Sequence, residues 1–296
     1  MAANTYTGRL QQQAHPRRFA QTREKIIVYT ILILGCVVTL TPFVWTILAS
    51  FKPHAEIIDP INRTFFPENF TFDNYLTIFN DESLPLERFY FNSAFVAIGN
   101  VITLSFSSSL FGYLFAKYNF RFKRAMYVYI LGTMMIPFQL TMIPSYLILL
   151  EFNLTNNLWG MVVLSWFDAF GIFLMRQFIS TIPDELIDAA RVDGSSEWQI
   201  YWRIILPQIL PALATYGTLV FILNWNAYLW PLFVARRDVV MTLPVALATL
   251  QAGPRALTEW NMVMAGAVIT VLPILLIYMF AQRWFVSGII SGGIKG

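Results

Sequence analysis

The chain has 296 residues, of which 57% are hydrophobic and only 12% are charged, whereas about a quarter of the residues in an average soluble domain are charged. So few charges cannot cover the surface of a water-soluble protein of this length, so lipid must be the solvent for most of that surface. The net charge of +3 does not indicate nucleic-acid binding, because the basic residues lie in short segments between apolar runs.

Six apolar segments are long enough to cross a membrane, since a helix needs about 20 apolar residues to span the hydrocarbon core. We expect these helices at 26–50, 89–117, 125–150, 159–179, 209–233 and 262–285. Residues 1–25 precede them as a polar N-terminal segment, and residues 26–296 form the transmembrane domain. The sequence therefore predicts an all-α integral membrane protein with six transmembrane helices.

The distribution of Lys and Arg orients these helices. With six crossings, 14 of the 20 Lys and Arg residues fall on one side of the membrane. They lie in the N-terminal segment, in the connections after the second and fourth helices, and in the C-terminal tail. Because cytoplasmic loops carry an excess of Lys and Arg, both termini are expected in the cytoplasm.

The connection between the fourth and fifth helices, residues 181–207, is too polar to span lipid but carries clear helix signals. Pro183 suits the first turn of a helix, and Asp184 and Glu185 favour the positive end of the helix dipole. Gly194 is expected to end this helix, because glycine adopts the left-handed conformation without a steric penalty. Between these ends, four residues recur at helical spacing: Leu186, Ala189, Ala190 and Asp193.

A second short helix is predicted directly after this glycine. Ser196 and Gln199 form a capping-box pattern, in which each side chain bonds the backbone N–H of the other residue. Large apolar residues follow before Pro207 and Pro211 begin the fifth transmembrane helix, namely Trp198, Ile200, Tyr201, Trp202 and Ile204. Physically, this helix–glycine–helix unit is either an amphipathic helix on the membrane surface or a knob that docks into a groove of a partner protein.

The same segment resembles the cytoplasmic signature loop of ABC importer permeases. That loop reads Glu-Ala-Ala, three residues, Gly, nine residues, Ile-x-Leu-Pro. In this chain 188–190 reads Asp-Ala-Ala, Gly194 follows after three residues, and 204–207 reads Ile-Ile-Leu-Pro after nine more. Asp188 takes the place of the usual Glu, which keeps the negative charge but shortens the side chain.

Shorter matches extend over nearly the whole chain and are similar to the carbohydrate-uptake branch, specifically the maltose-transporter second-permease type. They include Phe66-Pro67, Asn92-Ser93, Ile136-Pro137, Trp225-Asn226, Leu243-Pro244 and the tail 292–296. The resemblance implies a type I permease fold, a second permease subunit, two ATP-binding subunits and an extracytoplasmic sugar-binding protein. It also implies that 181–207 holds the coupling helix that contacts the ATPase, through Glu185, Asp188, Ala189, Ala190, Asp193, Gly194 and Trp198.

The expected function is therefore that of a permease subunit of an ATP-driven sugar importer in the plasma membrane of a prokaryote. The chain has no Gly-x-x-x-x-Gly-Lys-Ser/Thr phosphate loop, so we expect no cofactor on this chain and ATP use by the partner subunits. One alternative is a permease for another solute, such as a glycerol-phosphate compound or a polyol. The other is an intramembrane enzyme, which would need paired catalytic groups. The scattered His15 and His54 predict no metal site.

Asp168 is the acidic residue placed deepest in the predicted helices. It lies about nine residues into the expected fourth helix, or roughly 14 Å at about 1.5 Å per residue. A charge at that depth costs on the order of 2.5–3.5 kcal/mol, and Arg176 is too far along the same helix to pair with it. We therefore expect Asp168 either to face a water-lined pathway or to form a structural hydrogen bond with a neighbouring helix.

The expected fifth helix carries amide and aromatic side chains that suit a carbohydrate, because sugars offer hydroxyls for hydrogen bonds and C–H faces for stacking. On one continuous helix, Trp225 and Tyr228 share a face, as do Asn224 and Tyr228. The candidate substrate-pathway residues are Asp168, Asn224, Trp225, Asn226 and Tyr228. The other interpretation of the fifth-helix set is helix packing together with an interfacial aromatic belt.

Two further features have mainly structural interpretations. The second helix contains a group of serines, which predicts close helix packing, at Ser105, Ser107, Ser108 and Ser109. The glycine-rich tail from Gly288 is cytoplasmic in this topology. It is expected either to be a disordered end or to enter the ATPase interface.

Overall fold

The computed structural model describes residues 14–61, 64–81, 84–252 and 259–293, with side chains over 24–61, 64–81, 84–249 and 259–280. The first half of the chain forms α2 (Ala14–Ser50), α3 (His54–Ile58), α4 (Asp73–Asn80), α5 (Leu86–Lys117), α6 (Lys123–Thr133) and α7 (Phe138–Glu151). The middle forms α8 (Leu158–Val163), α9 (Ala169–Ser180), α10 (Asp184–Val192), α11 (Glu197–Ile200), the π-helix η1 (Tyr201–Ile205) and α12 (Leu206–Trp225). The last part forms α13 (Leu229–Val234), the 3₁₀-helix η2 (Asp238–Val240), α14 (Leu243–Ala252) and α15 (Trp260–Gly293). Over these described ranges the fold contains no strand, which confirms the predicted all-α class.

Four continuous helices are long and apolar enough to cross a membrane: Glu24–Ser50 of α2, Leu86–Lys117, Glu197–Trp225 and Trp260–Phe280 of α15. They correspond to the first, second, fifth and sixth predicted segments. The pair α6 and α7 adds one more crossing if it is counted as a single bent span. The described part of the chain thus has four or five candidate spans, against six in the sequence-based prediction.

The prediction of one continuous third helix over 125–150 is wrong. This segment divides into α6 and α7, whose axes are bent by 99°. Pro137 lies at the break, in extended conformation, and α7 begins directly after it. Proline has no backbone N–H to donate and disfavours helical geometry in the residue before it. The apolar run is therefore continuous in sequence while the helix is not.

The predicted fourth helix, 159–179, is also divided. α8 ends at Val163, and α9 begins at Ala169 with Asp168 as its N-cap. The fifth predicted helix, 209–233, begins and ends earlier than expected, because the helix from Glu197 runs unbroken through η1 into α12 and ends at Trp225. α15 continues through Gly293, so the described part of the glycine-rich tail is helical.

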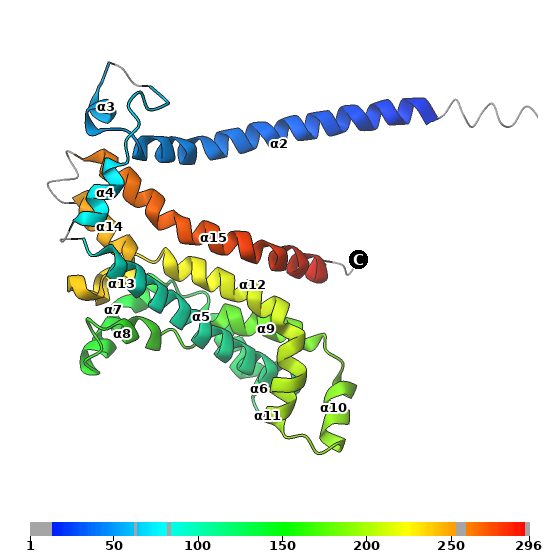
Figure 1. The fold of residues 1–296 in the computed structure, drawn as a ribbon. Helices are drawn as coiled ribbons and strands as arrows, with labels where there is room; N and C mark the ends of the chain where they lie inside the picture. Colours follow the sequence, from blue (N-terminus) through cyan, green and yellow to red (C-terminus); the bar gives the residue numbers. More distant parts are fainter. Residues whose placement is uncertain (1–13, 62–63, 82–83, 253–258, 294–296) are drawn as a thin grey trace, which may run out of the picture.

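α5 lies at the centre of the bundle, between α9 and α12 (Figure 1). Small residues allow this packing, because a Cβ at Gly112 would lie 2.6 Å from the Cβ of Met175 and 2.9 Å from the backbone nitrogen of Arg176. Ser108 and Ser109 are fully buried, which confirms the predicted close packing for these two serines. The serine and glycine face of α5 therefore brings α9 and α12 against one helix.

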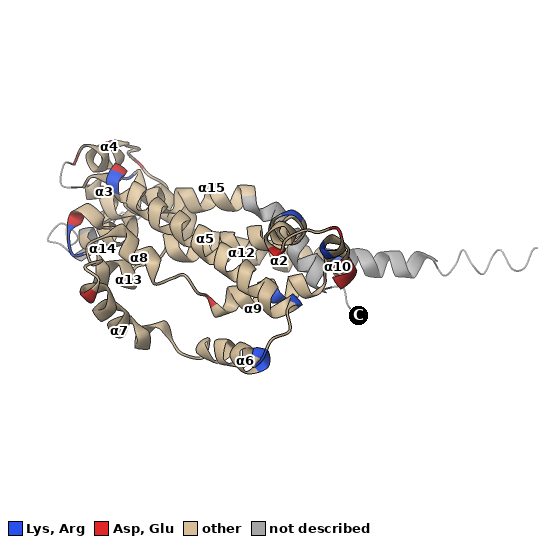
Figure 2. Cartoon of the chain, turned by 90° about the horizontal axis from the view of Figure 1, so that it is seen from below, with Lys and Arg blue, Asp and Glu red and all other residues tan. Residues whose placement is uncertain are grey.

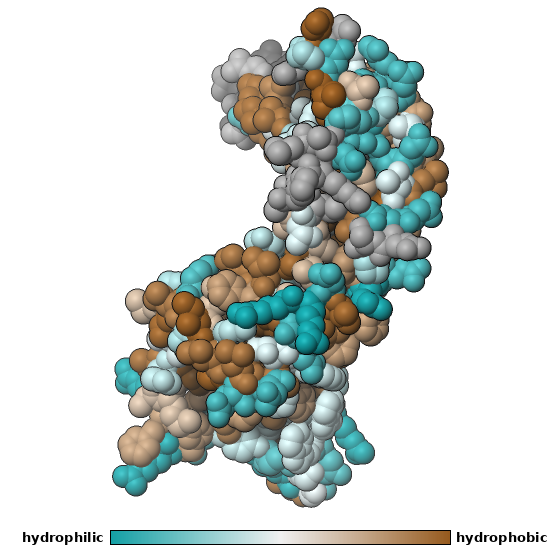
Figure 3. Space-filling view, turned by 90° about the vertical axis from the view of Figure 1, so that its left-hand side faces the viewer, coloured by the Kyte–Doolittle hydropathy of each residue, from teal (hydrophilic) through white to brown (hydrophobic). Residues whose placement is uncertain are grey.

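The two ends of the molecule carry different elements. In Figure 1, α3, α4, α13 and α14 lie at one end, and the start of α2, the end of α15 and α10 lie toward the other. Charged residues concentrate toward these ends, while the long middle stretches of α5, α12 and α15 are uncharged (Figure 2). Figure 3 looks onto the first end, where hydrophilic side chains cover much of the upper part of the surface. This distribution fits a slab of lipid around the middle of the bundle.

α2 stands apart from the rest of the bundle. Its apolar window has no buried residue, whereas the windows of the other three long helices are 28% to 39% buried. α2 packs against α15 near its C-terminal end and diverges from it toward its N-terminus (Figure 1). Most of the apolar surface of α2 is therefore left for lipid or another chain to cover.

Candidate functional site

The predicted helix–glycine–helix unit is present, and α10 is its first helix. α10 begins at Asp184 after Pro183, with Asp184 and Glu185 in its first turn. Gly194 has the positive φ of 79° that the sequence predicts. Its N–H donates to the carbonyl of Arg191, and the N–H of Ser195 donates to the carbonyl of Ala190. These two bonds form a Schellman motif, in which a left-handed residue satisfies the last carbonyls of a helix.

The second helix begins with the predicted capping box. The backbone N–H of Ser196 donates to Oε1 of Gln199 at 2.7 Å, and the N–H of Gln199 donates to Oγ of Ser196 at 3.4 Å. The second helix is not a separate short element, however, because α11 continues through the π-turn of η1 into α12. Any movement of the turn at Gly194 is therefore connected directly to a membrane-crossing helix.

One side of α10 is anchored in the protein core. Ile187 is 1% exposed and Ala190 is 8% exposed. Both belong to the hydrophobic cluster that also contains Ile179, Ile182, Ile200, Tyr201 and Ile205. Fully burying an aliphatic side chain of this size contributes about 1.5–3 kcal/mol. Burial of Ile187 therefore holds α10 against the C-terminal end of α9 and against α11 and η1, which lead into α12.

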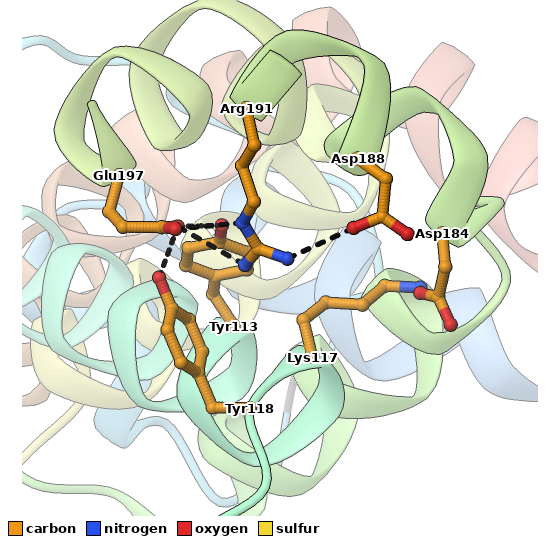
Figure 4. A network of polar contacts seen from close by, with 7 residues as sticks. All are labelled: Tyr113, Lys117, Tyr118, Asp184, Asp188, Arg191 and Glu197. Carbon is orange, nitrogen blue, oxygen red and sulfur yellow. Dashed lines mark hydrogen bonds and ion pairs between the residues drawn. The ribbon is translucent and has the colours of Figure 1, made fainter. Parts of the chain in front are cut away.

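Ion pairs attach the two ends of α10 to the rest of the unit (Figure 4). Nζ of Lys117, the last residue of α5, lies 2.6 Å from Oδ1 of Asp184 and also donates to the carbonyl of Ile182. The hydrogen bond from Lys117 lowers the pKa of the Asp184 carboxyl below its ordinary value. At the other end, Arg191 pairs with Asp188 at 3.1 Å and with Glu197 at 2.8 Å. Asp188, the residue that replaces the usual Glu, thus pairs with an arginine of its own helix.

Glu197 joins three elements through one carboxylate. Its Oε1 accepts from Nε of Arg191, and its Oε2 accepts from the hydroxyls of Tyr113 and Tyr118 (Figure 4). The hydrogen bond to Glu197 raises the pKa of Arg191 further above its ordinary value. Burial raises the pKa of Tyr118, and its bond to Glu197 raises that pKa further. At neutral pH the arginine is therefore charged and the Tyr118 hydroxyl is a protonated donor.

The outward side of α10 is partly apolar and exposed. Val192 is 87% exposed, Leu186 is 47% exposed, and Trp198 at the start of α11 is 57% exposed. Four other predicted coupling residues also have exposed side chains, namely Glu185, Asp188, Ala189 and Asp193. Large exposed apolar side chains next to carboxylates are typical of a protein contact. The structure therefore brings all seven predicted coupling residues into one compact unit, with Ala190 on its buried side.

Asp168 lies at the start of a helix instead of inside one. It caps α9, accepting from the N–H groups of Phe170 at 3.3 Å and Gly171 at 2.9 Å. The hydroxyl of Tyr216 on α12 donates to its Oδ2 at 2.7 Å. The interpretation of Asp168 as a residue inside a continuous helix is wrong, because a capping carboxylate satisfies the free N–H groups where a helix begins. The alternative of a structural hydrogen bond to a neighbouring helix is confirmed.

The candidate pathway residues on the fifth helix are separated by the end of α12. Trp225 is 3% exposed and its Nε1–H donates to the carbonyl of Thr270 at 3.1 Å. Asn224 accepts from Nδ2 of Asn100 at 2.7 Å. The shared helical face with Tyr228 is wrong, because α12 ends at Trp225 and Tyr228 is the N-cap of α13. Asn226 and Tyr228 are exposed, while Asn224 and Trp225 contribute to packing.

Sequence reasoning missed the residues that hold the unit in place. Tyr113, Lys117 and Tyr118 were given no role, although each supplies a hydrogen bond to the unit. Tyr216 was also missed, and it supplies a hydrogen bond to Asp168. The spacing of Tyr113 and Lys117, one turn apart on α5, is the local signal that both side chains point the same way. Over the described ranges, no three His, Cys, Asp or Glu side chains lie close enough together to hold a metal ion.

Comparison with known proteins places this chain among transport proteins. The family model described as "Binding-protein-dependent transport system inner membrane component" matches residues 108–291. The arabinooligosaccharides transport system permease protein AraQ of Halalkalibacterium halodurans is 35% identical over 256 residues, covering 86% of this chain and 91% of the relative. The lactose transport system permease protein LacG of Rhizobium radiobacter is 34% identical over 271 residues, covering 91% and 96%.

A third relative and a solved structure extend the comparison. The sn-glycerol-3-phosphate transport system permease protein UgpE of Brucella abortus is 32% identical over 277 residues, covering 90% of this chain and 96% of the relative. A chain from the crystal structure of a bacterial ABC transporter involved in the import of alginate superimposes with a TM-score of 0.77 at 25% identity, covering 90% of this chain and 98% of that chain. The chain therefore belongs to the family of binding-protein-dependent transport system inner membrane components.

Proposed function

We propose that this chain is the permease subunit of an ATP-driven sugar importer in the cytoplasmic membrane of a prokaryote. Two relatives that are 35% and 34% identical are named for arabinooligosaccharide and lactose transport. The structural neighbour belongs to an importer of the polysaccharide alginate. A relative named for sn-glycerol-3-phosphate transport makes a glycerol-phosphate permease the second candidate.

The construction of α10 supports a coupling role. The ion pair of Lys117 and the pairing of Arg191 with Glu197 hold its inner side, while Val192 and Leu186 are exposed on the outside. Burying such side chains at a partner contributes about 25 cal/mol per Å². Two ATP-binding subunits supply the motor, one of them covering α10. ATP is bound by those subunits, and this chain binds no cofactor and carries no catalytic site.

The topology follows from the same assignment. Residues 1–25 form the cytoplasmic segment, and 26–296 form the permease domain with its coupling loop 181–207. Six segments cross the membrane, namely α2, α5, the α6–α7 pair, the α8–α9 pair, the α12–α13 pair and α15. The start of α2 and the end of α15 lie toward the same end as α10 (Figure 1), which supports cytoplasmic termini together with the excess of Lys and Arg on that side.

A second permease completes the pathway. α2 leaves its apolar surface outside its own bundle, and a partner permease packed against that surface would bury it. The sugar passes between the two permeases, where Asp168, Asn226 and Tyr228 provide polar or aromatic groups. Asn224 and Trp225 support that wall from behind. An extracytoplasmic sugar-binding protein delivers the substrate at the end that carries α3, α4 and α13.

Reconstituted transport tests this assignment. The chain, its partner permease, the ATP-binding subunits and the cognate binding protein would be placed in proteoliposomes. ATP-dependent uptake of radiolabelled oligosaccharides would be compared with uptake of sn-glycerol-3-phosphate. We expect uptake of a sugar that stops when ATP is left out. Uptake of sn-glycerol-3-phosphate alone would establish the second candidate, and ATP-independent flux would contradict both.

A further inference from the structure

A basic cleft lies between α6 and α9, apart from the coupling unit. It has a volume of about 1000 Å³. Lys123 and Arg124 from the first turn of α6 and Arg176 from α9 line it, together with Asn119, Ala125, Val128 and four aromatic residues, Phe120, Phe122, Tyr127 and Tyr129. No acidic side chain lines the cleft. Three positive charges from two helices thus meet in one open space.

These three cations have no acidic partner in the part of the chain that the structure describes. Arg176 donates from Nε to the carbonyl of Phe115 at 3.2 Å, and its guanidinium lies 4.5 Å from the ring centre of Tyr127. By contrast, Lys117 and Arg191 on the same side of the molecule are paired with carboxylates. Like charges held close together without a counterion are unfavourable. An anion from outside the chain would remove that cost.

A second observation at the same cleft points to a missing polar partner. The hydroxyl of Tyr127 is buried and has no hydrogen-bond partner among the described residues. Buried hydroxyls without partners are rare in folded proteins, and each one calls for a partner such as water or a ligand. Tyr127 also lies beneath the Arg176 guanidinium. The residue with the unpartnered hydroxyl therefore lines the same cleft as the three unpaired cations.

The rim of the cleft is apolar, which narrows the class of anion. Tyr129 is 76% exposed, Phe122 is 65% exposed and Val128 is 60% exposed. Basic residues mark the beginning of α6 in Figure 2, on the side of the molecule that carries α10. A small soluble anion would leave these apolar side chains uncovered. A ligand that carries both a negative headgroup and acyl chains would satisfy the cations and the rim together.

We propose that this cleft binds the phosphate headgroup of an anionic phospholipid, with Lys123, Arg124 and Arg176 as the cationic contacts. The inference rests on the proposed orientation, which places the start of α6 at the cytoplasmic leaflet. The bound lipid links α6 to α9, two helices that belong to different broken segments. Anionic lipid then stabilises the packing of the bent α6–α7 pair against the bundle.

The test measures lipid retention by the assembled transporter complex. Complexes purified in detergent would be titrated with phosphatidylglycerol or phosphatidylcholine, and retained lipids would be counted by native mass spectrometry. The variant is Lys123→Gln/Arg124→Gln. Its matched control is Arg236→Gln/Arg237→Gln, which removes two exposed positive charges near the opposite end. Each basic residue strengthens the attraction of an anionic lipid, so we expect at least about a tenfold loss of phosphatidylglycerol affinity in the variant alone.

Three outcomes would overturn the proposal. They are equal phosphatidylglycerol retention by the variant and the wild type, no preference for phosphatidylglycerol over phosphatidylcholine, and full displacement of the lipid by millimolar inorganic phosphate, which would show a site for a soluble anion. If the double variant fails to assemble, the single change Arg124→Gln decides, because this side chain is exposed. Lipid counting does not require transport, so its failure is distinguishable from failure of the proposed sugar import.

Discussion

Arg191 in the last turn of α10 and Glu197 at the start of α11 form a 2.8 Å ion pair across the glycine turn that separates the two helices. The pair bridges only five intervening residues, so it fixes the angle between the helices. Glu197 also accepts from Tyr113 on α5 and from Tyr118 just beyond it. These bonds fix the position of both short helices relative to α5, a membrane-crossing helix. Through Glu197, α10 is therefore connected to both α5 and the helix that continues into α12.

Glu197→Gln tests this link. Glutamine keeps the size of the side chain but removes the charge that holds Arg191, and hydrogen bonds to charged groups contribute about 1.5–3 kcal/mol. Both partners are partly exposed, so we expect the free energy that holds α10 in place to fall by about 1 kcal/mol. Hydrogen exchange of α10 in the assembled complex should rise about fivefold. Glu185→Gln, on the same helix and outside these ion pairs, should leave exchange unchanged. Equal protection in both variants would show that Glu197 does not hold α10.

Gly112→Ala tests the close packing of α5 against α9. A methyl group at Gly112 would lie 2.6 Å from the Cβ of Met175 and 2.9 Å from a backbone nitrogen, so the two helices must separate. Overpacking of this kind costs about 1–3 kcal/mol. Gly132→Ala is the matched control, because nothing lies within 4 Å of its added carbon. The thermal unfolding midpoint of the complex should fall only for Gly112→Ala. A midpoint equal to that of the control would refute the helix contact.

Variants of Asp168 test whether its role as the N-cap of α9 or its negative charge matters for stability. Asp168→Asn should retain the cap of α9, because asparagine is as good an N-cap as aspartate. Asp168→Leu removes the cap and also removes the acceptor of the Tyr216 hydroxyl. The residue Tyr216 is 1% exposed, so water cannot replace that acceptor. We expect these two effects together to lower the free energy of unfolding by about 2–3 kcal/mol. The thermal unfolding midpoint should therefore be highest for the wild type, lower for Asp168→Asn and lowest for Asp168→Leu.

Sugar uptake measured on the same Asp168 variants separates structure from pathway chemistry. If Asp168 acts only as a cap, the Asn variant should transport at close to the wild-type rate. Loss of uptake in a fully stable Asn variant would instead assign the carboxylate to the substrate pathway. Tyr216→Phe provides the control from the other side of the hydrogen bond, since it keeps the Asp168 charge and removes the donor.

Local signals in the sequence predicted local structure well. The left-handed turn at Gly194 and the capping box of Ser196 and Gln199 depend on residues within one helical turn of each other. They could be predicted because the groups that satisfy the backbone are neighbours in the chain. The apolar runs of α2, α5 and α15 were equally evident, since hydropathy over about 20 residues determines whether a helix can cross lipid.

The breaks and the long-range contacts were beyond the same reasoning. Averaging apolarity over 125–150 conceals Pro137, whose missing N–H separates α6 from α7. At Asp168, an intrahelical charge and a helix cap have the same sequence, and only the position of Tyr216, 48 residues away, distinguishes them. Glu197 meets Tyr113 across 84 residues of sequence. Such pairings follow from packing of whole helices, which the sequence pattern of one segment does not specify.

We propose that the turn at Gly194 carries motion between the ATPase and the membrane helices. No atom lies within 4 Å of a Cβ built at Gly194, so only its φ of 79° restricts substitution. Asparagine tolerates this left-handed conformation, whereas it costs other residues about 1–2 kcal/mol, and more for β-branched valine. Gly194→Asn and Gly194→Val therefore form a matched pair that differs mainly in backbone preference.

The deciding measurement is ATP hydrolysis by the reconstituted complex, stimulated by binding protein and sugar, in variants that insert and assemble like the wild type. We predict that Gly194→Asn retains stimulation within about twofold, while Gly194→Val loses at least about fivefold, as a cost of about 1–2 kcal/mol implies, and loses sugar uptake in parallel. Wild-type stimulation in an assembled Gly194→Val complex would contradict the assignment of α10 as the coupling helix.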